Sequence, residues 1–302
     1  MKFAIEYVVD STADGASLAT PEGLAEVATV AEELGFAALA LPEHPAPSRK
    51  WLTHGGHETL DSMAALGFVA ALTSRLQIMP HLLVVPYRNP FLAAKALATL
   101  DRLSRGRLVV GAGSGYLSSE FLALGVDMEQ RKVLFDEGIE VMRGVWSSTN
   151  FSFEGETVTA KDVAAIPGPL TPGGPPIIVG GNSALSRRRA ARLNGWSPML
   201  LSAEVASSTR TQALTTIPEL AKGIESVRTM AADAGNDGPL LFNVATPHLE
   251  FPGSGGSLEE HRDHLGQLED AGVDQFLVRP SHRGVAAAID SLRTYADAVG
   301  LA

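Results

Sequence analysis

Short apolar runs alternate with segments of helical periodicity along the whole chain, and this rhythm constrains the fold more than any other feature. The apolar runs lie at residues 3–9, 36–41, 76–85, 108–111, 177–179, 196–201, 240–245 and 275–278. They are nearly continuous rather than alternating, which is typical of parallel strands covered on both faces. Eight strand-then-helix units in 302 residues predict an α/β fold, the TIM (β/α)8 barrel.

The helices are marked by their N-terminal signals and apolar stripes. Thr20 precedes Pro21 and Asn89 precedes Pro90, so each pair predicts an N-cap followed by proline at the first helical position. A long helical region is expected over residues 119–146, with Phe135, Ile139, Met142 and Trp146 on its buried face. In the helix that begins at Pro90, the spacing predicts inward-facing Leu92, Ala96, Leu100 and Leu103.

Two stretches interrupt the rhythm. Residues 150–176 are rich in Gly and Pro and contain a hairpin-like segment at 150–155, and residues 202–218 are irregular. We interpret them as insertions after the fourth and sixth βα units of one domain, residues 1–302, that cover an end of the fold and shape a substrate pocket. An open doubly wound sheet is the alternative architecture, but no Gly-x-Gly-x-x-Gly follows the first strand.

Composition and charge exclude several classes of protein. The absence of cysteine excludes a disulfide scaffold, a thiol nucleophile, a Cys-ligated zinc and an iron–sulfur cluster. The net charge of −10 disfavours a nucleic-acid-binding chain. No run of about 18 apolar residues predicts a membrane span, and because the N-terminal segment contains Glu6 we expect no signal peptide there. We expect a cytoplasmic enzyme.

The active site of a TIM barrel lies at the carboxyl ends of its strands. There the sequence places His44, which we take as the candidate group for proton transfer or coenzyme polarisation; a purely structural histidine is the alternative. Weaker candidates are His54, His57, His81 and His248. No His-Glu-x-x-His pattern occurs, so we expect no metal site.

Two strand ends are rich in glycine. At the first, backbone N–H groups at a helix N-terminus could bind a phosphate, although a tight turn with an ordinary cap is the alternative. It comprises Val179, Gly180, Gly181, Asn182 and Ser183. The second could admit a planar group close to the backbone, or its glycines could simply fit a crowded strand end. It comprises Gly111, Ala112, Gly113, Ser114 and Gly115. The arginines that follow the first loop, Arg187, Arg188, Arg189 and Arg192, are interpreted as a solvated helix face.

Several motifs in order resemble the bacterial luciferase-like monooxygenase superfamily. The first motifs run from Pro86-Tyr87-Arg88-Asn89-Pro90 through Lys95 and Leu100-Asp101-Arg102-Leu103-Ser104-Arg105-Gly106-Arg107 to Val110-Gly111-Ala112-Gly113. Others are Glu120-Phe121, Leu124-Gly125-Val126, Arg131, Glu137, Pro175-Pro176-Ile177-Ile178-Val179-Gly180-Gly181, Asn194-Gly195-Trp196 and Gly272-Val273-Asp274. The resemblance covers nearly the whole chain.

The resemblance implies a barrel that binds FMN or the deazaflavin coenzyme F420 at the strand ends. Length and the residues from Tyr87 to Pro90 are most similar to the actinobacterial F420-dependent branch, with FMN as the alternative. It further implies that His44 lies beside the coenzyme ring, that Val84 and Val85 form a bulge with a non-proline cis peptide behind it, and that Gly180 to Asn182 hold the phosphate. Sugar-phosphate-oxidising members have a glutamate where this chain has Tyr116.

The expected function is hydride transfer between F420 and a small organic substrate. The alternatives are an FMN-dependent monooxygenase that uses reduced flavin and O2, and a barrel that binds coenzyme without catalysis. Tyr116, Trp196 and His81 are expected to line the substrate pocket. The resemblance also implies a homodimer, with residues 61–72 and 92–103 as candidate contact surfaces.

Overall fold

The computed structural model describes residues 1–12, 14–203, 206 and 211–301. In these residues nine strands form one parallel sheet in the order β3-β2-β1-β11-β10-β9-β8-β5-β4. They are β1 (Lys2–Glu6), β2 (Ala38–Leu41), β3 (Gln77–Pro80), β4 (Leu83–Val84), β5 (Val110–Gly113), β8 (Ile177–Gly180), β9 (Gly195–Ser197), β10 (Leu241–Val244) and β11 (Gln275–Val278).

Strands β3 and β4 close the sheet into a barrel. Both come from the predicted third strand, which is interrupted at residues 81–82. β3 pairs with β2 and also bridges to the chain before β5 through Ile78 and Leu108, while β4 pairs with β5. Because this third strand touches both neighbours, the sheet has no open edge between them. The structure therefore confirms the barrel over the open doubly wound sheet.

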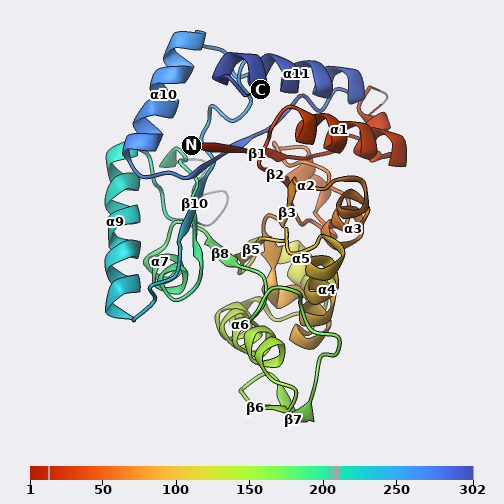
Figure 1. The fold of residues 1–302 in the computed structure, drawn as a ribbon, viewed down its shortest axis with the longest axis vertical. Coiled ribbons are helices and arrows are strands. Elements are labelled where there is room, and N and C mark those ends of the chain that lie inside the picture. Colours follow the sequence, from red (N-terminus) through yellow and green to blue (C-terminus); the bar gives the residue numbers. More distant parts are fainter. Residues whose placement is uncertain (13, 204–205, 207–210, 302) are drawn as a thin grey trace.

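The helices surround the strands (Figure 1). The long ones are α1 (Pro21–Glu33), α3 (Ser62–Leu72), α4 (Pro90–Leu103), α6 (Arg131–Ser147), α7 (Ala184–Ala191), α9 (Ile217–Asp233), α10 (Leu258–Asp270) and α11 (Val285–Val299). Two short ones are α2 (Arg49–Leu52) and α5 (Ser118–Ala123). Thr20 and Asn89 cap α1 and α4 as predicted. Within the described part of the chain, no helix is long and apolar enough to cross a membrane.

Two helix predictions need correction. The expected helix over residues 119–146 is broken into α5 and α6, because Gly125 takes a left-handed conformation with φ of 68°. Its predicted buried residues, from Phe135 to Trp146, are confirmed. In α4, however, Leu92 and Leu103 are 70% and 61% exposed, not inward. The small side chains Ala93, Ala94 and Ala98 face the core instead, with Leu97 and Leu100.

The first insertion packs on the helical outside of the barrel. Its antiparallel hairpin, β6 (Phe151–Glu154) and β7 (Thr159–Val163), lies beside α6 in Figure 1. The carboxylate of Glu137 in α6 accepts a hydrogen bond from Thr157 N at 3.0 Å, and Asp101 in α4 accepts from Leu170 N at 2.7 Å. These contacts place the insertion over α4 and α6 rather than over the strand ends, so it does not shape the site as expected.

Inside the barrel, one layer of side chains is apolar and the next is polar. The apolar layer contains small or slender side chains: Ala4, Ala38, Ala40, Met79, Val109, Ile178, Ala245 and Leu277. Side chains two positions further along a strand point to the same side. Glu6 follows Ala4, and His81 follows Met79, so both point into the barrel at its carboxyl end. Trp196 and Val179 have the opposite parity and face the helices.

Candidate functional site

A buried polar layer lies at the carboxyl end of the barrel interior. Nε2 of His81 lies 2.8 Å from Ser197 Oγ and 3.2 Å from Asn243 Nδ2. Burial lowers the pKa of His81, and the charge of Glu6 opposes this only in part, so the imidazole is neutral near pH 7. His81 therefore lies inside the barrel, just after β3, and the substrate-pocket role expected of it stays a prediction.

Glu6 supplies a fixed negative charge to this layer. Arg279, just after the last strand, contacts it with Nη2 2.6 Å from Oε2, and Arg279 also pairs with Glu250 at 3.1 Å. Burial by itself would raise the pKa of Glu6, but the charge and hydrogen bond of Arg279, together with His57 and His81, outweigh burial and the pKa is lowered. The first and last strands are thus joined by an ion pair at the carboxyl end of the barrel.

His44 is held by a buried carboxylate. Its Nδ1 lies 3.3 Å from Oε2 of Glu120, a residue of α5 that follows His44 by 76 positions in the sequence. Glu120 is fully buried and also accepts from the Tyr87 hydroxyl at 2.8 Å and from Ala46 N at 3.3 Å. With Nδ1 engaged in this way, Nε2 is the nitrogen left for a reacting group.

Aromatic rings surround His44. Ring centroids of Trp51, His57 and Tyr116 lie 4.4, 5.2 and 6.0 Å from that of His44. Burial lowers the pKa of His57 to about 4, and burial together with the Glu120 charge raises the pKa of Tyr116 to about 12. Both are therefore neutral near pH 7. Nε2 of His57 is buried and has no hydrogen-bond partner among the described residues, which marks this cluster as a place where a ligand could bind.

Leu82 lies among the carboxyl ends of the strands. The structure has a non-proline cis peptide at His81–Leu82, so the prediction of a cis peptide at Val84 and Val85 is wrong. Val84 packs with Tyr87 and Phe121, and Val85 is buried in the main core. The interruption of the third strand therefore comes earlier than expected, since β3 ends at Pro80 and β4 begins at Leu83.

Three glycines make room for the Leu82 side chain. A Cβ at Gly111, Gly113 or Gly180 would lie 3.2, 3.1 or 2.1 Å from a Leu82 methyl group. All three glycines lie at strand positions that face the barrel interior. The space that was expected to admit a planar group next to Gly113 is therefore lined by Leu82, which is half-buried. Gly115, with φ of 75°, packs against Val84 and Phe121, and Ser114 between these glycines is partly exposed.

The loop before α7 has the shape of an anion site. Gly181 has φ of 96°, and Ser183 accepts a hydrogen bond from Ser186 N at 3.1 Å as the N-cap of α7. Arg187 donates to Asn182 O at 2.9 Å, which brings a guanidinium to the same turn. The Asn182 side chain is buried and bonds to Met199 and to Gln212 O. Asn182 therefore shapes the loop, and Gly181, Ser183, Ser186 and Arg187 are the groups left to hold an anion.

Two predicted site residues face away from the barrel interior. Trp196 is fully buried, donates from Nε1 to Gly181 O at 2.7 Å, and packs against Gly223 of α9. This placement differs from the expected pocket role. Val179 belongs to the core between strands and helices, so its side chain contributes packing and not a ligand contact. The second insertion does reach the site, since Leu214 pairs with Leu201 and Thr211 bonds to Asn182 N.

Comparison with known proteins places this geometry in a family. Residues 1–245 match the family model of the luciferase-like monooxygenases. The chain belongs to this family. Luciferase-like enzymes are oxidoreductases and monooxygenases that use a flavin-type coenzyme, FMN or F420, and the sequence resemblance is thereby confirmed.

The chain is similar to curated relatives and to solved structures. It is 36% identical over 146 residues to the FMNH(2)-dependent dimethylsulfone monooxygenase of Pseudomonas fluorescens, a match covering 47% of this chain and 39% of that relative. Monooxygenase RslO1 from Streptomyces bottropensis superposes with a TM-score of 0.78 at 21% identity over 99% of this chain and 98% of RslO1. An F420-dependent secondary alcohol dehydrogenase superposes with a TM-score of 0.70 at 19% identity over 99% of each chain.

The sequence missed Glu120, Tyr87 and Trp51 as members of the site, and it offered His57 only as a weaker candidate. In the described residues, no group of three or more His, Cys, Asp and Glu side chains could hold a metal ion. Glu120 had one usable signal, since the Glu120-Phe121 pair is part of the family resemblance. Trp51 had none, because it lies between the second strand and α3 in a stretch without periodicity.

Proposed function

We propose that this luciferase-like protein transfers a hydride between coenzyme F420 and a small organic substrate at the carboxyl ends of the strands. The observation that carries the proposal is the His44–Glu120 pair. A buried carboxylate holds one imidazole nitrogen and leaves the other beside a cluster of aromatic rings. That arrangement suits a group that gains or loses a proton while a hydride moves.

The residues present fit a coenzyme with a flat ring and a phosphate. Leu82 offers an apolar surface among three glycines, and the backbone of residues 81–83 would support the ring. The phosphate would lie at Gly181, Ser183 and Arg187, at the N-terminus of α7. The bound coenzyme supplies the hydride donor or acceptor, and the chain supplies orientation and proton transfer.

His44 would move the proton. With a coenzyme bound that could accept the C–H hydride of an alcohol, Nε2 of His44 would accept the hydroxyl proton as the carbonyl forms. The carboxylate of Glu120 faces Nδ1 and stabilises the imidazolium that results. Tyr87 and Ala46 donate hydrogen bonds to that carboxylate and fix its orientation. Tyr116 would contact the substrate beside His44. It would do so as a neutral phenol, because its pKa is raised.

A second candidate is an FMN-dependent monooxygenase that uses reduced flavin and O2. The observation that favours it is the 36% identity to an FMNH(2)-dependent monooxygenase. The same loop before α7 and the same residues around Leu82 would hold FMN. A barrel that binds coenzyme without catalysis is the non-enzymatic alternative.

Fluorescence titration of the purified chain with F420 and with FMN separates these candidates. We expect tighter binding of F420, and tighter binding of FMN would favour the monooxygenase. His44→Ala should retain coenzyme binding and lower kcat by about 10²–10⁴-fold. His54→Ala is the matched control, because His54 is exposed and bonds to Lys50 O. Unchanged turnover in His44→Ala would refute its proton-transfer role, and binding without turnover on any substrate would favour the non-catalytic barrel.

A homodimer through α3 and α4 forms part of this proposal. Phe68 and Leu72 of α3 and Leu92 and Leu103 of α4 are large apolar side chains on the surface, at helical spacings of four and eleven residues. Each pair therefore shares a helix face. Leu92→Glu should shift the mass measured by light scattering from dimer to monomer. Leu122→Glu, at an exposed leucine of α5, should leave it unchanged.

A further inference from the structure

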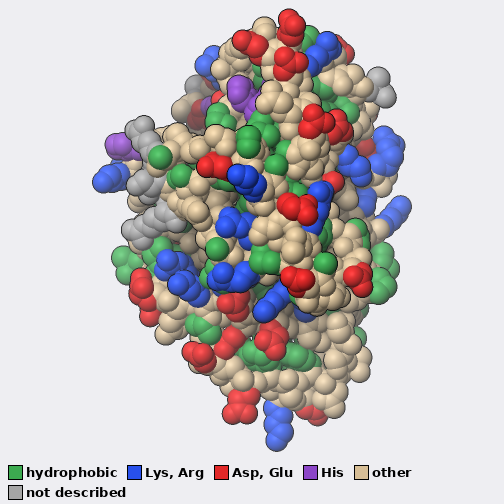
Figure 2. All heavy atoms as spheres, turned by 90° about the vertical axis from the view of Figure 1, so that its left-hand side faces the viewer, with side chains coloured by type: hydrophobic (Ala, Val, Ile, Leu, Met, Phe, Trp, Pro, Cys, Tyr) green, Lys and Arg blue, Asp and Glu red, His purple; other side chains and the backbone are tan. Residues whose placement is uncertain are grey.

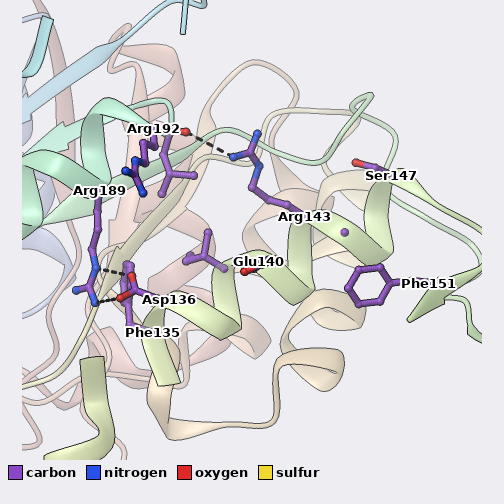
Figure 3. A pocket seen from close by; sticks show the side chains of 11 residues that line it. Phe135, Asp136, Glu140, Arg143, Ser147, Phe151, Arg189 and Arg192 are labelled. Carbon is purple, nitrogen blue, oxygen red and sulfur yellow. Dashed lines mark hydrogen bonds and ion pairs between the residues drawn. The ribbon is translucent and has the colours of Figure 1, made fainter. Parts of the chain in front are cut away.

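A groove of about 510 Å³ lies outside the barrel, between α6 and α7 (Figure 3). It does not include the strand-end residues. Its apolar surface is formed by Phe135, Ile139, Phe151 and Leu193, and polar side chains stand around it. The volume lies within the range of about 300–1,000 Å³ that is typical of small-molecule sites. We propose that this groove binds a small organic anion, an aromatic carboxylate, at a site separate from the coenzyme.

One arginine of the groove is already committed to the protein. Arg189 donates to Asp136 through Nε at 2.6 Å and through Nη2 at 2.8 Å, and Figure 3 shows this paired contact. Its guanidinium also lies over the ring of Phe135, 4.2 Å from the centroid. The charges of Arg189 and Asp136 therefore compensate each other, and the pair fixes one end of the groove.

Two further arginines have no such partner. Arg143 donates to the backbone carbonyl of Arg192 at 3.5 Å. Among the described residues, no carboxylate lies within ion-pair distance of Arg143 or Arg192. Glu140 is the remaining acid of the lining, so the groove keeps an excess of one positive charge. Figure 2 shows Lys and Arg side chains gathered across the middle of the face that carries α7 and α9, although the whole chain has a net charge of −10.

The combination of charge and apolar surface selects the ligand class. A carboxylate can accept two parallel hydrogen bonds from a guanidinium. An aromatic body would cover the partly exposed ring of Phe151 and the small exposed parts of Ile139 and Leu193, which inorganic phosphate would leave in contact with water. In Figure 3 the side chains of Arg143 and Arg192 stand on the same side of the groove, opposite Glu140. The carboxylate would bind on the arginine side and the ring would lie toward Phe151.

Calorimetric titration of the full chain with 3-phenylpropionate tests the proposal. Saturable one-site binding is expected, with weaker binding of the neutral 3-phenylpropanol and of inorganic phosphate. Arg143→Gln and Arg192→Gln should each weaken binding about tenfold, because each removes a charged hydrogen-bond donor. Arg188→Gln is the matched control: Arg188 lies in α7, one turn before Arg192, but does not line this groove.

Further outcomes decide against the site. Equal affinity of the neutral alcohol, or unchanged affinity in both Arg143→Gln and Arg192→Gln, would overturn the proposal. Binding of an acidic peptide with no binding of 3-phenylpropionate would overturn it as well, since the groove would then be a protein-docking surface. Binding that persists in His44→Ala and in the presence of saturating F420 or FMN supports a separate site, whereas competition with the coenzyme would overturn it.

Discussion

Gly180→Ala tests whether Leu82 fills the barrel mouth as the structure shows. The new Cβ would lie 2.1 Å from one Leu82 methyl carbon and 2.8 Å from the other. On the β5 side, Leu82 packs over Gly111 and Gly113, where an added Cβ would lie only 3.1–3.2 Å from its side chain. Since Leu82 is half-buried, the side chain must either remain compressed or rotate toward the solvent at the strand ends.

The magnitude follows from two opposing effects. Overpacking of this kind costs about 1–3 kcal/mol, and replacing glycine where φ is not positive returns about 0.4–1 kcal/mol through the unfolded state. We expect a net loss of about 1–2 kcal/mol in the free energy of unfolding. In Gly180→Ala/Leu82→Ala the clash is absent, so the two substitutions should be coupled by about 1–2 kcal/mol.

Urea unfolding of the four proteins in this double-mutant cycle measures the coupling. Gly266→Ala is the control, because Gly266 lies within α10 and an added Cβ would meet nothing within 4 Å. That variant should be stabilised by about 0.5–1 kcal/mol through helix propensity. Additive effects of Gly180→Ala and Leu82→Ala would refute the assigned packing, as would a Gly180→Ala variant as stable as Gly266→Ala.

Two further predictions concern stability. The pKa of His57 is lowered to about 4 in the folded chain from its ordinary value of 6.5. Between these pH values the unfolded state binds more protons than the folded state. The free energy of unfolding therefore falls as the pH drops from 6.5 to 4, by up to about 3 kcal/mol. Urea unfolding across this range should show a flatter pH dependence in His57→Gln than in the wild type or in the exposed-site control His282→Gln, and identical slopes would contradict the buried neutral imidazole. Arg107 donates to the carbonyls of Ala70 and Thr73 at 2.9 Å each, at the end of α3. Arg107→Met removes the donor to these carbonyls and should lower the free energy of unfolding by about 2–4 kcal/mol. The control Arg105→Asn, at a φ of 59° that asparagine tolerates, should change it little. Equal losses of stability in the two variants would show that the guanidinium contacts are not the cause.

Much of the barrel could be predicted from the sequence because the signals are local. Apolar runs mark the strands, and Thr20 and Asn89 accept from the first-turn N–H groups that they were expected to cap. Which side chains of each strand face into the barrel could not be predicted in the same way. In a parallel strand covered on both faces, inward and outward residues are both apolar. Trp196 therefore gave no sign that it faces α9 while its neighbour Ser197 faces His81.

The sequence by itself determined the order of strands and helices, the histidine at the end of the second strand and the glycine-rich turn before α7. Only the tertiary structure decided what those residues touch. Glu120 meets His44 across 76 residues, and Leu82 meets Gly180 across the barrel mouth. Such contacts exist because closing the barrel brings the ends of all its strands together, and closure depends on the pairing of strands that are distant in sequence.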